Sequence, residues 1–175
     1  MAIEGDLGPA ESLAEAIRAS GIPCARGPSH GQIGDGRIVL DGATLMLTDG
    51  RTIARRIAEG APHDLVLFDL ALDYARAPRI GLAGSPPAVL VAAGLIQALG
   101  KKASPLPDAP ALVVLRTIAR LAAEAAQAIA DGVADPDAID TAMRLGANYP
   151  LGPIAWANTI GDARLSAALA AITQA

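Results

Sequence analysis

Few aromatic residues occur in this chain: one Trp, two Tyr and one Phe among 175 residues. Hydrophobic residues nevertheless make up 52% of the sequence, and most of them are Ala, Leu, Ile and Val. A chain of this length can bury a sizeable core. Because large rings are scarce, that core must form by close approach of small side chains, which favours packed helices.

Cysteine is equally scarce, since Cys24 is the only one. A single thiol excludes an internal disulfide and every metal site made from several cysteines. We therefore expect Cys24 to be a small buried apolar residue in a protein of a reducing compartment.

An excess of charge of one sign is lacking as well. The 14 basic and 18 acidic residues give a net charge of −4 and are interspersed along the chain. This distribution provides neither a field that attracts nucleic acid nor a polybasic patch for a membrane surface. No nucleic-acid or membrane partner is predicted.

Long hydrophobic runs are also missing, because none approaches the roughly 20 residues of a membrane-spanning helix. Residues 1–6 carry acidic side chains where a secretory signal carries basic ones. A cytoplasmic location is expected.

The first hundred residues alternate between helical and extended patterns. Asp41-Gly42 is a dipeptide typical of a hairpin turn. Alternation of short helices and strands favours an α/β layer. The predicted helices are residues 10–20, 51–59 and 87–99, and the predicted strands are residues 22–25, 38–40, 43–47, 65–68 and 79–83.

A longer helix is predicted over residues 111–130. Its apolar stripe includes Leu115 and Ile118 and continues to Ala126 and Ile129. A helix of this length would measure roughly 30 Å, about the width of a small domain.

Two further features of this region bear on its organisation. Arg120 and Glu124 are spaced for an i,i+4 ion pair on the polar side of the long helix. Prolines and Asp108 interrupt all periodicity over residues 104–110, so we place a boundary between two units there. Only helices are predicted after it.

A helix is expected to begin at Asp135-Pro136. Asp is a good N-cap acceptor, and Pro is favoured at the first helical position, where its missing N–H costs nothing. Gly146 is suited to a left-handed end of this helix.

The only Trp follows in the next helix. Gly152-Pro153 can start that helix, which places Trp156 and Ile160 one turn apart on a common side. The residues alone therefore predict a helix–helix corner anchored by a core Trp.

This corner carries a resemblance to a known family. Residues 136–143 follow the pattern Pro-Asp-x-Ile-Asp-x-Ala-Met, and residues 148–156 read Asn-Tyr-Pro-x-Gly-Pro-x-Ala-Trp. The pattern resembles the C-terminal helical domain of 3-hydroxyacyl-CoA dehydrogenases, most of all the second copy in two-module 3-hydroxybutyryl-CoA dehydrogenases. Residues 100–102 and 108–116 are similar to the family's strand-to-helix junction, so the resemblance is specific over about residues 100–172. The family-motif residues that it assigns to the helical core or interface are Arg116, Glu124, Asp140, Met143, Asn148, Tyr149, Pro150, Gly152, Pro153 and Trp156.

The resemblance implies a two-part fold. Residues 1–108 would form an α/β half with a shortened, degenerate Rossmann-like sheet. Residues 109–175 would form an all-α C-terminal domain of the 6-phosphogluconate/3-hydroxyacyl-CoA dehydrogenase type.

The glycine turn that binds NAD in such a fold departs from its pattern here. A Gly-x-Gly-x-x-Gly turn lets backbone N–H groups approach the pyrophosphate. Residues 5–9 read Gly-Asp-Leu-Gly-Pro, in which the spacing is wrong, Asp6 would repel a pyrophosphate and Pro9 lacks an N–H. Arg26 stands where the ribose-binding acid is expected. No cofactor is therefore expected. NAD would be the cofactor only under the alternative in which the turn has been misaligned.

The acid and base that the resemblance implies are missing too. The family's catalytic His aligns with Ala83 and its Asn with Leu115, and no carboxylate occurs over residues 87–93, where the partner Glu would follow. His30 and His63 lie in loops without a matched carboxylate, so we interpret both as solvated.

Asp69 and Asp73 are the best polar candidates in the first half. They follow an apolar strand, and strand ends are where α/β proteins hold ligands. Turn formation by these two acids is the favoured alternative.

Three functions remain open. The first is a non-catalytic dimerisation or partner-completing module of fatty-acid or phenylacetate-type degradation, because the family's helical domain forms the dimer interface. The second is an active NAD-dependent 3-hydroxyacyl-CoA (3-hydroxybutyryl-CoA) dehydrogenase whose site the alignment above misplaces. The third is an acyl-CoA binding module, for which Lys101 and Lys102, near Arg116, are weak candidates for the CoA phosphates. The expected partner is accordingly a second copy, a catalytic 3-hydroxyacyl-CoA dehydrogenase or an acyl-CoA.

Overall fold

The computed structural model describes residues 1–27 and 36–174, and it places seven of their segments in one mixed sheet. The strand order is β2-β1-β3-β4-β5-β6-β7. Three neighbouring pairs are parallel (β1 with β2, β4 with β5, β6 with β7), and the other three are antiparallel. The strands are β1 (Ala2–Glu4), β2 (Ala25–Arg26), β3 (Arg37–Leu40), β4 (Ala43–Leu47), β5 (Leu65–Phe68), β6 (Arg79–Gly84) and β7 (Lys102–Pro105).

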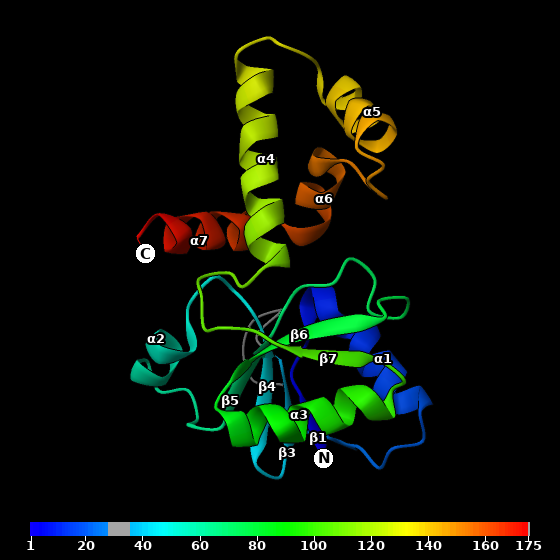
Figure 1. Cartoon of the computed structure of the whole chain (residues 1–175), viewed down its shortest axis with the longest axis vertical. Helices are drawn as coiled ribbons and strands as arrows, with labels where there is room; N and C mark the ends of the chain where they lie inside the picture. Colours follow the sequence, from blue (N-terminus) through cyan, green and yellow to red (C-terminus); the bar gives the residue numbers. More distant parts are fainter. Residues whose placement is uncertain (28–35, 175) are drawn as a thin grey trace.

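The helices divide between the sheet and a separate helical layer (Figure 1). In the first half, α1 and α3 bury their apolar residues in the same core as the strands, and α2 lies at one side. In the second half, α4 rises from the sheet, and α6 and α7 pack against its lower part. The helices are α1 (Glu11–Ala19), α2 (Ile53–Ala58), α3 (Pro86–Ala98), α4 (Val114–Ala130), α5 (Pro136–Gly146), α6 (Pro153–Ile160) and α7 (Asp162–Thr173).

The expected α/β half followed by an all-helical half is confirmed. Residues 38–40 and 43–47 form the predicted antiparallel hairpin, in which Leu40 pairs with Ala43 and Gly42 has a φ of 87°. The predicted helices over 10–20, 51–59 and 87–99 and the strands over 65–68 and 79–83 are present within one or two residues of their predicted bounds. In the described part of the chain, no helix is long and apolar enough to cross a membrane.

Several local predictions were wrong. The strand expected over 22–25 is β2, at Ala25–Arg26, and β1, β7 and α7 were not predicted. Strand β7 begins at Lys102 and ends at Pro105, so its last two residues fall within the segment 104–110 that was predicted to interrupt all periodicity. An edge strand can contain Pro because one of its sides needs no hydrogen-bond donors. Cys24 is half-buried rather than buried.

Two predicted features of α4 also fail. Arg120 and Glu124 are both exposed and form no ion pair with each other among the described residues. Ala126 is exposed and Ile129 only half-buried, so the apolar stripe is covered in the first part of the helix alone.

Helix α4 begins at Val114, three residues later than predicted. Ala111 and Leu112 precede it with left-handed φ values of 60° and 49°. Such values are costly for residues other than glycine and persist only where surrounding contacts impose them. Both side chains are buried. The turn that they form directs the first N–H groups of α4 toward the end of β5.

The Asp69 carboxylate accepts those N–H groups. Its Oδ2 accepts from Val113 at 3.0 Å and Val114 at 2.8 Å, and its Oδ1 accepts from Leu70 at 2.9 Å and Leu115 at 3.4 Å. An anion at this position complements the positive end of the helix. Burial raises the pKa of the Asp69 carboxyl, and the four N–H donors act in the opposite direction. This single side chain connects the sheet to the helical half.

Replacing Asp69 tests this connection. We expect Asp69→Ala to lower the free energy of unfolding by about 2 kcal/mol, because it leaves buried N–H groups without an acceptor. Asp73→Ala is the matched control in the same loop and should cost less, about 0.5–1 kcal/mol, since Asp73 accepts from two N–H groups of an exposed turn rather than a buried one. Urea denaturation measures both values, and equal losses would contradict the role given to Asp69.

Candidate functional site

The turn after β1 satisfies its own N–H groups. Asp6 Oδ1 accepts from the N–H of Gly8 at 2.6 Å, and Glu11 Oε2 accepts from the N–H of Leu7 at 3.3 Å. Gly5 and Gly8 both have positive φ, so the glycines serve to close the turn.

A dinucleotide does not fit this turn. In a Rossmann fold the phosphates are bound by free N–H groups at the start of the first helix. Here two carboxylates already accept from N–H groups of the turn, and they would place negative charge beside a pyrophosphate. Pro9 removes a further donor. Arg26, at the position expected for the ribose-binding acid, is exposed.

The positions aligned with the family's acid–base residues lie in the core. Ala83 is fully buried in β6, where it pairs with Leu67, and Leu115 is fully buried in α4. His63 is exposed and precedes β5, at the opposite end of that strand from Asp69. His30 falls outside the described residues. Within the described ranges, no three His, Cys, Asp or Glu side chains are grouped to hold a metal ion.

The two candidate aspartates after β5 have structural roles. Asp69 caps α4 as described, while Asp73 Oδ1 accepts from the N–H groups of Ala75 and Arg76 at 2.9 and 3.2 Å. Asp73 thus forms a turn, as the favoured alternative predicted, whereas the capping of a distant helix by Asp69 was not predicted.

The Trp corner is organised by a third carboxylate. Asp140 of α5 accepts from the N–H groups of Ile154 and Ala155 at 2.9 and 3.0 Å and so caps α6. Asp135 caps α5 itself through the N–H of Ala138 at 2.8 Å, as predicted. A Cβ on Gly152 would lie 2.1 Å from Asp140 Cγ, so only glycine admits this approach.

The left-handed residue of this corner is Asn148 rather than Gly146. Asn148 has a φ of 55°, whereas Gly146 is the last residue of α5 and has no positive φ. Asn tolerates this region better than most residues because its side chain is short and polar. The turn brings the Tyr149 and Trp156 rings to a centroid distance of 5.3 Å, and Trp156 is only 6% exposed.

The remaining family-motif residues are scattered. Arg116 donates from Nε and Nη2 to the Pro110 carbonyl at 3.0 and 2.8 Å and so holds the strained turn before α4. Glu124 is exposed, Met143 is half-buried, Pro150 is exposed, and Pro153 is buried at the first position of α6.

The two lysines that were candidates for the CoA phosphates lie between α3 and β7 and at the start of β7. Lys101 Nζ donates to the carbonyls of Ala75 and Ala77 at 3.0 and 2.9 Å, which fixes the loop before β6. Lys102 is exposed on the edge strand β7.

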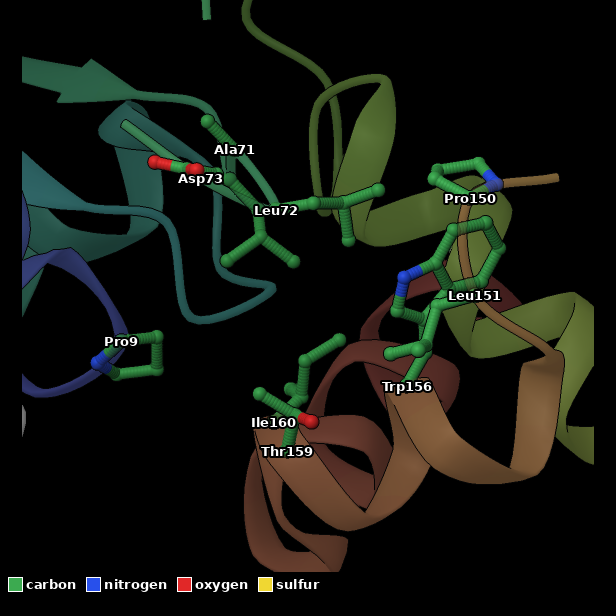
Figure 2. A pocket seen from close by; sticks show the side chains of 10 residues that line it. Pro9, Ala71, Leu72, Asp73, Pro150, Leu151, Trp156, Thr159 and Ile160 are labelled. Atoms are coloured by element: carbon green, nitrogen blue, oxygen red, sulfur yellow. The ribbon is translucent and has the colours of Figure 1, made fainter. Parts of the chain in front are cut away.

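Sequence reasoning missed a cavity of about 230 Å³ between the two halves of the fold. Its walls come from the loop after β5, including Leu70 and Leu72, and from α6, including Trp156 and Ile160 (Figure 2). Pro9 of the turn after β1 closes one side. A local signal in the sequence was the apolar segment Leu70-Ala71-Leu72 between two aspartates after a buried strand, but it does not reveal the opposite wall of the cavity.

Two family models match this chain. Residues 45–110 match the 3-hydroxybutyryl-CoA dehydrogenase reduced Rossmann-fold domain, and residues 112–175 match the 3-hydroxyacyl-CoA dehydrogenase C-terminal domain. The chain belongs to the 3-hydroxyacyl-CoA dehydrogenase family. The first of these models begins within β4, after the turn at residues 5–10.

Characterised relatives carry names from the same family. The 3-hydroxyadipyl-CoA dehydrogenase of Escherichia coli K12 is 34% identical over 131 residues, which are 75% of this chain and 27% of that protein. A probable 3-hydroxybutyryl-CoA dehydrogenase of Bacillus subtilis is 41% identical over 81 residues, or 46% of this chain and 28% of that protein. The chain thus spans little more than a quarter of the length of these relatives.

Solved structures agree on the fold. The crystal structure of 3-hydroxybutyryl-CoA dehydrogenase from E. coli K12 is 32% identical and superposes with a TM-score of 0.69 over 82% of this chain and 30% of that one. M. tuberculosis FadB2, at 16% identity, superposes with a TM-score of 0.66 over 94% of this chain and 72% of that chain, which shows the fold alone.

The contact between Gly152 and Asp140 yields a prediction. Gly152→Ala should lower the free energy of unfolding by about 2 kcal/mol, because the added methyl overlaps the capping carboxylate. Gly146→Ala is the matched control, since a Cβ there meets no atom within 4 Å, and it should raise stability by about 0.5 kcal/mol. Denaturation followed by the fluorescence of the single Trp gives both values. A neutral Gly152→Ala variant would refute the requirement for glycine.

Proposed function

We propose that this chain is a non-catalytic assembly module of the 3-hydroxyacyl-CoA dehydrogenase family, in fatty-acid or phenylacetate-type degradation. It associates with a second copy of itself, or completes a separately encoded catalytic 3-hydroxyacyl-CoA dehydrogenase, and has no NAD site of its own. The names of its relatives support the assignment to this metabolism. The assembly role rests on one observation, which is that part of the helical half extends from the fold with its apolar side chains exposed.

This part, called the arm, consists of the end of α4, the connection to α5, and α5 itself, residues 126–147. Beyond Ala125 no residue of α4 is buried, and α5 has no buried residue at all. Apolar side chains lie along it in spite of this: Val133 is 75% and Leu145 is 82% exposed. Figure 1 shows α5 and the upper end of α4 extending away from the sheet.

An arm of this size suits a protein interface. An amphipathic helix normally buries its apolar stripe against another element. Stable interfaces use roughly 20 to 30 residues from each partner, and the arm supplies about 20. A partner helix set against α4 and α5 would cover the apolar residues that this chain leaves exposed.

The carboxylates that follow β1 and β5 support a role without chemistry. Asp6, Glu11 and Asp69 are all engaged by N–H groups of their own chain. No imidazole lies among them in the described ranges, which supports the proposal that this chain does not carry out hydride transfer itself.

The two other candidate functions have less support. An active NAD-dependent dehydrogenase would need phosphates bound beside Asp6 and a base supplied from outside the aligned positions. An acyl-CoA binding module would need cations for the CoA phosphates, whereas Lys101 is held by two carbonyl groups. Calorimetric titration with acetyl-CoA tests the latter function, and the absence of both heat and a thermal shift would remove it.

Light scattering tests self-association. The wild-type chain should have the mass of a dimer, and Leu145→Asp should shift it to a monomer because a charge would be buried in the interface. Leu90→Asp is the matched control, since Leu90 is 73% exposed on α3 and lies outside the arm. A wild-type chain that is monomeric at all concentrations, or a dimer that survives Leu145→Asp, would contradict self-association through the arm.

Cofactor binding gives a separate prediction. Titration with NADH, followed by its fluorescence, should show no saturable binding, and NADH mixed with acetoacetyl-CoA should not be oxidised above background. These outcomes follow from the carboxylates that occupy the turn after β1. Saturable binding together with turnover would establish the active-dehydrogenase alternative.

A further inference from the structure

The cavity between the two halves is almost entirely apolar, and it lies within a single chain. Its volume of about 230 Å³ exceeds the 150 Å³ or so of an engineered protein cavity that binds benzene. It is smaller than the roughly 300 Å³ at which pockets for drug-sized ligands begin. A ring or short branched chain with a few additional atoms matches this space.

One polar group of the wall remains available to a ligand. Trp156 is more than nine-tenths buried, and none of the described residues accepts a hydrogen bond from its indole Nε1. Figure 2 shows this nitrogen on the side of the ring that faces Leu72 and Ile160, toward the cavity. In the described part of the chain this nitrogen is not among the fully enclosed polar atoms that lack a partner, so it is open to the cavity, where a ligand oxygen can accept its hydrogen bond.

The other polar side chains restrict the charge of the ligand. Thr159 already donates its hydroxyl proton to the Ala155 carbonyl at 2.9 Å. The Asp73 carboxylate accepts from its own loop and would repel an anion. No cationic side chain lines the cavity in the described part of the chain. The wall thus offers one donor and no positive charge.

We infer that this cavity is a binding site for a small neutral molecule with an apolar body and one hydrogen-bond acceptor, such as a carbonyl oxygen, which accepts from Trp156 Nε1. The body lies between Leu72 and Ile160. This inference does not rest on the proposed assembly role, because the site needs neither a partner nor a cofactor.

The single Trp permits a direct test by NMR, since the chain has one indole N–H signal. Cyclohexyl methyl ketone should shift that signal downfield in a saturable manner as its oxygen accepts the hydrogen bond. Isopropenylcyclohexane has the same shape with CH₂ in place of the oxygen. It should bind about fivefold more weakly, as loss of one neutral hydrogen bond implies, without the downfield shift. An unmoved signal with the ketone, or equal effects of the two compounds, would overturn the inference.

Two variants locate the site. Thr159→Phe should abolish the saturable shift by filling the cavity, whereas Thr141→Phe, the same change at an exposed position of α5, should leave it intact. In Trp156→Phe, saturation transfer to the compounds should show that the ketone has lost its preference over the hydrocarbon while the apolar body still binds. Binding that survives Thr159→Phe, or a preference that survives Trp156→Phe, would place the compound elsewhere and refute the assignment.

Discussion

The arrangement of this molecule depends on the buried Asp69 carboxylate at the junction of sheet and helices. It follows the inner strand β5 and accepts hydrogen bonds from the first N–H groups of α4, so the position of one loop residue determines where this long helix begins. Helices α6 and α7 pack on α4 in turn. Bringing those N–H groups to the carboxylate requires left-handed φ values at Ala111 and Leu112, which are unfavourable for residues other than glycine.

The same device recurs between segments that are distant in sequence. Asp108 accepts from the N–H groups of Ile53 and Ala54 and so caps α2, and Asp140 caps α6. In each case a carboxylate from one segment caps the first turn of a helix in another. These hydrogen bonds fix how the segments are oriented, which packing of small Ala side chains alone does not specify. With so few aromatic side chains available, polar caps carry much of the specificity of this fold.

Local chemistry predicted most elements, because hairpin dipeptides, Pro at the first helical position and apolar periodicity act within a few residues. The errors arose where a distant group decides the outcome. Residues 111–113 were predicted as helix because the sequence does not show that Asp69 lies beside them. Residues 104 and 105 were predicted as part of a boundary segment because the sequence does not show their pairing with β6. The turn and cap residues Asp73, Asp135 and Pro136 could be recognised from their immediate neighbours. The inter-unit cavity could not, because its walls come from segments about 80 residues apart that only the tertiary structure brings together.

The turn after β1 also bears on how this chain would behave in a cell. A nucleotide-binding turn with open N–H groups gains stability in proportion to the logarithm of ligand concentration once the ligand exceeds its dissociation constant. Here Asp6 and Glu11 supply the acceptors from within the chain. Under the proposed function, the folded population of this segment does not depend on the size or redox state of the nucleotide pool, so the proposed assembly would persist when the dinucleotide supply falls.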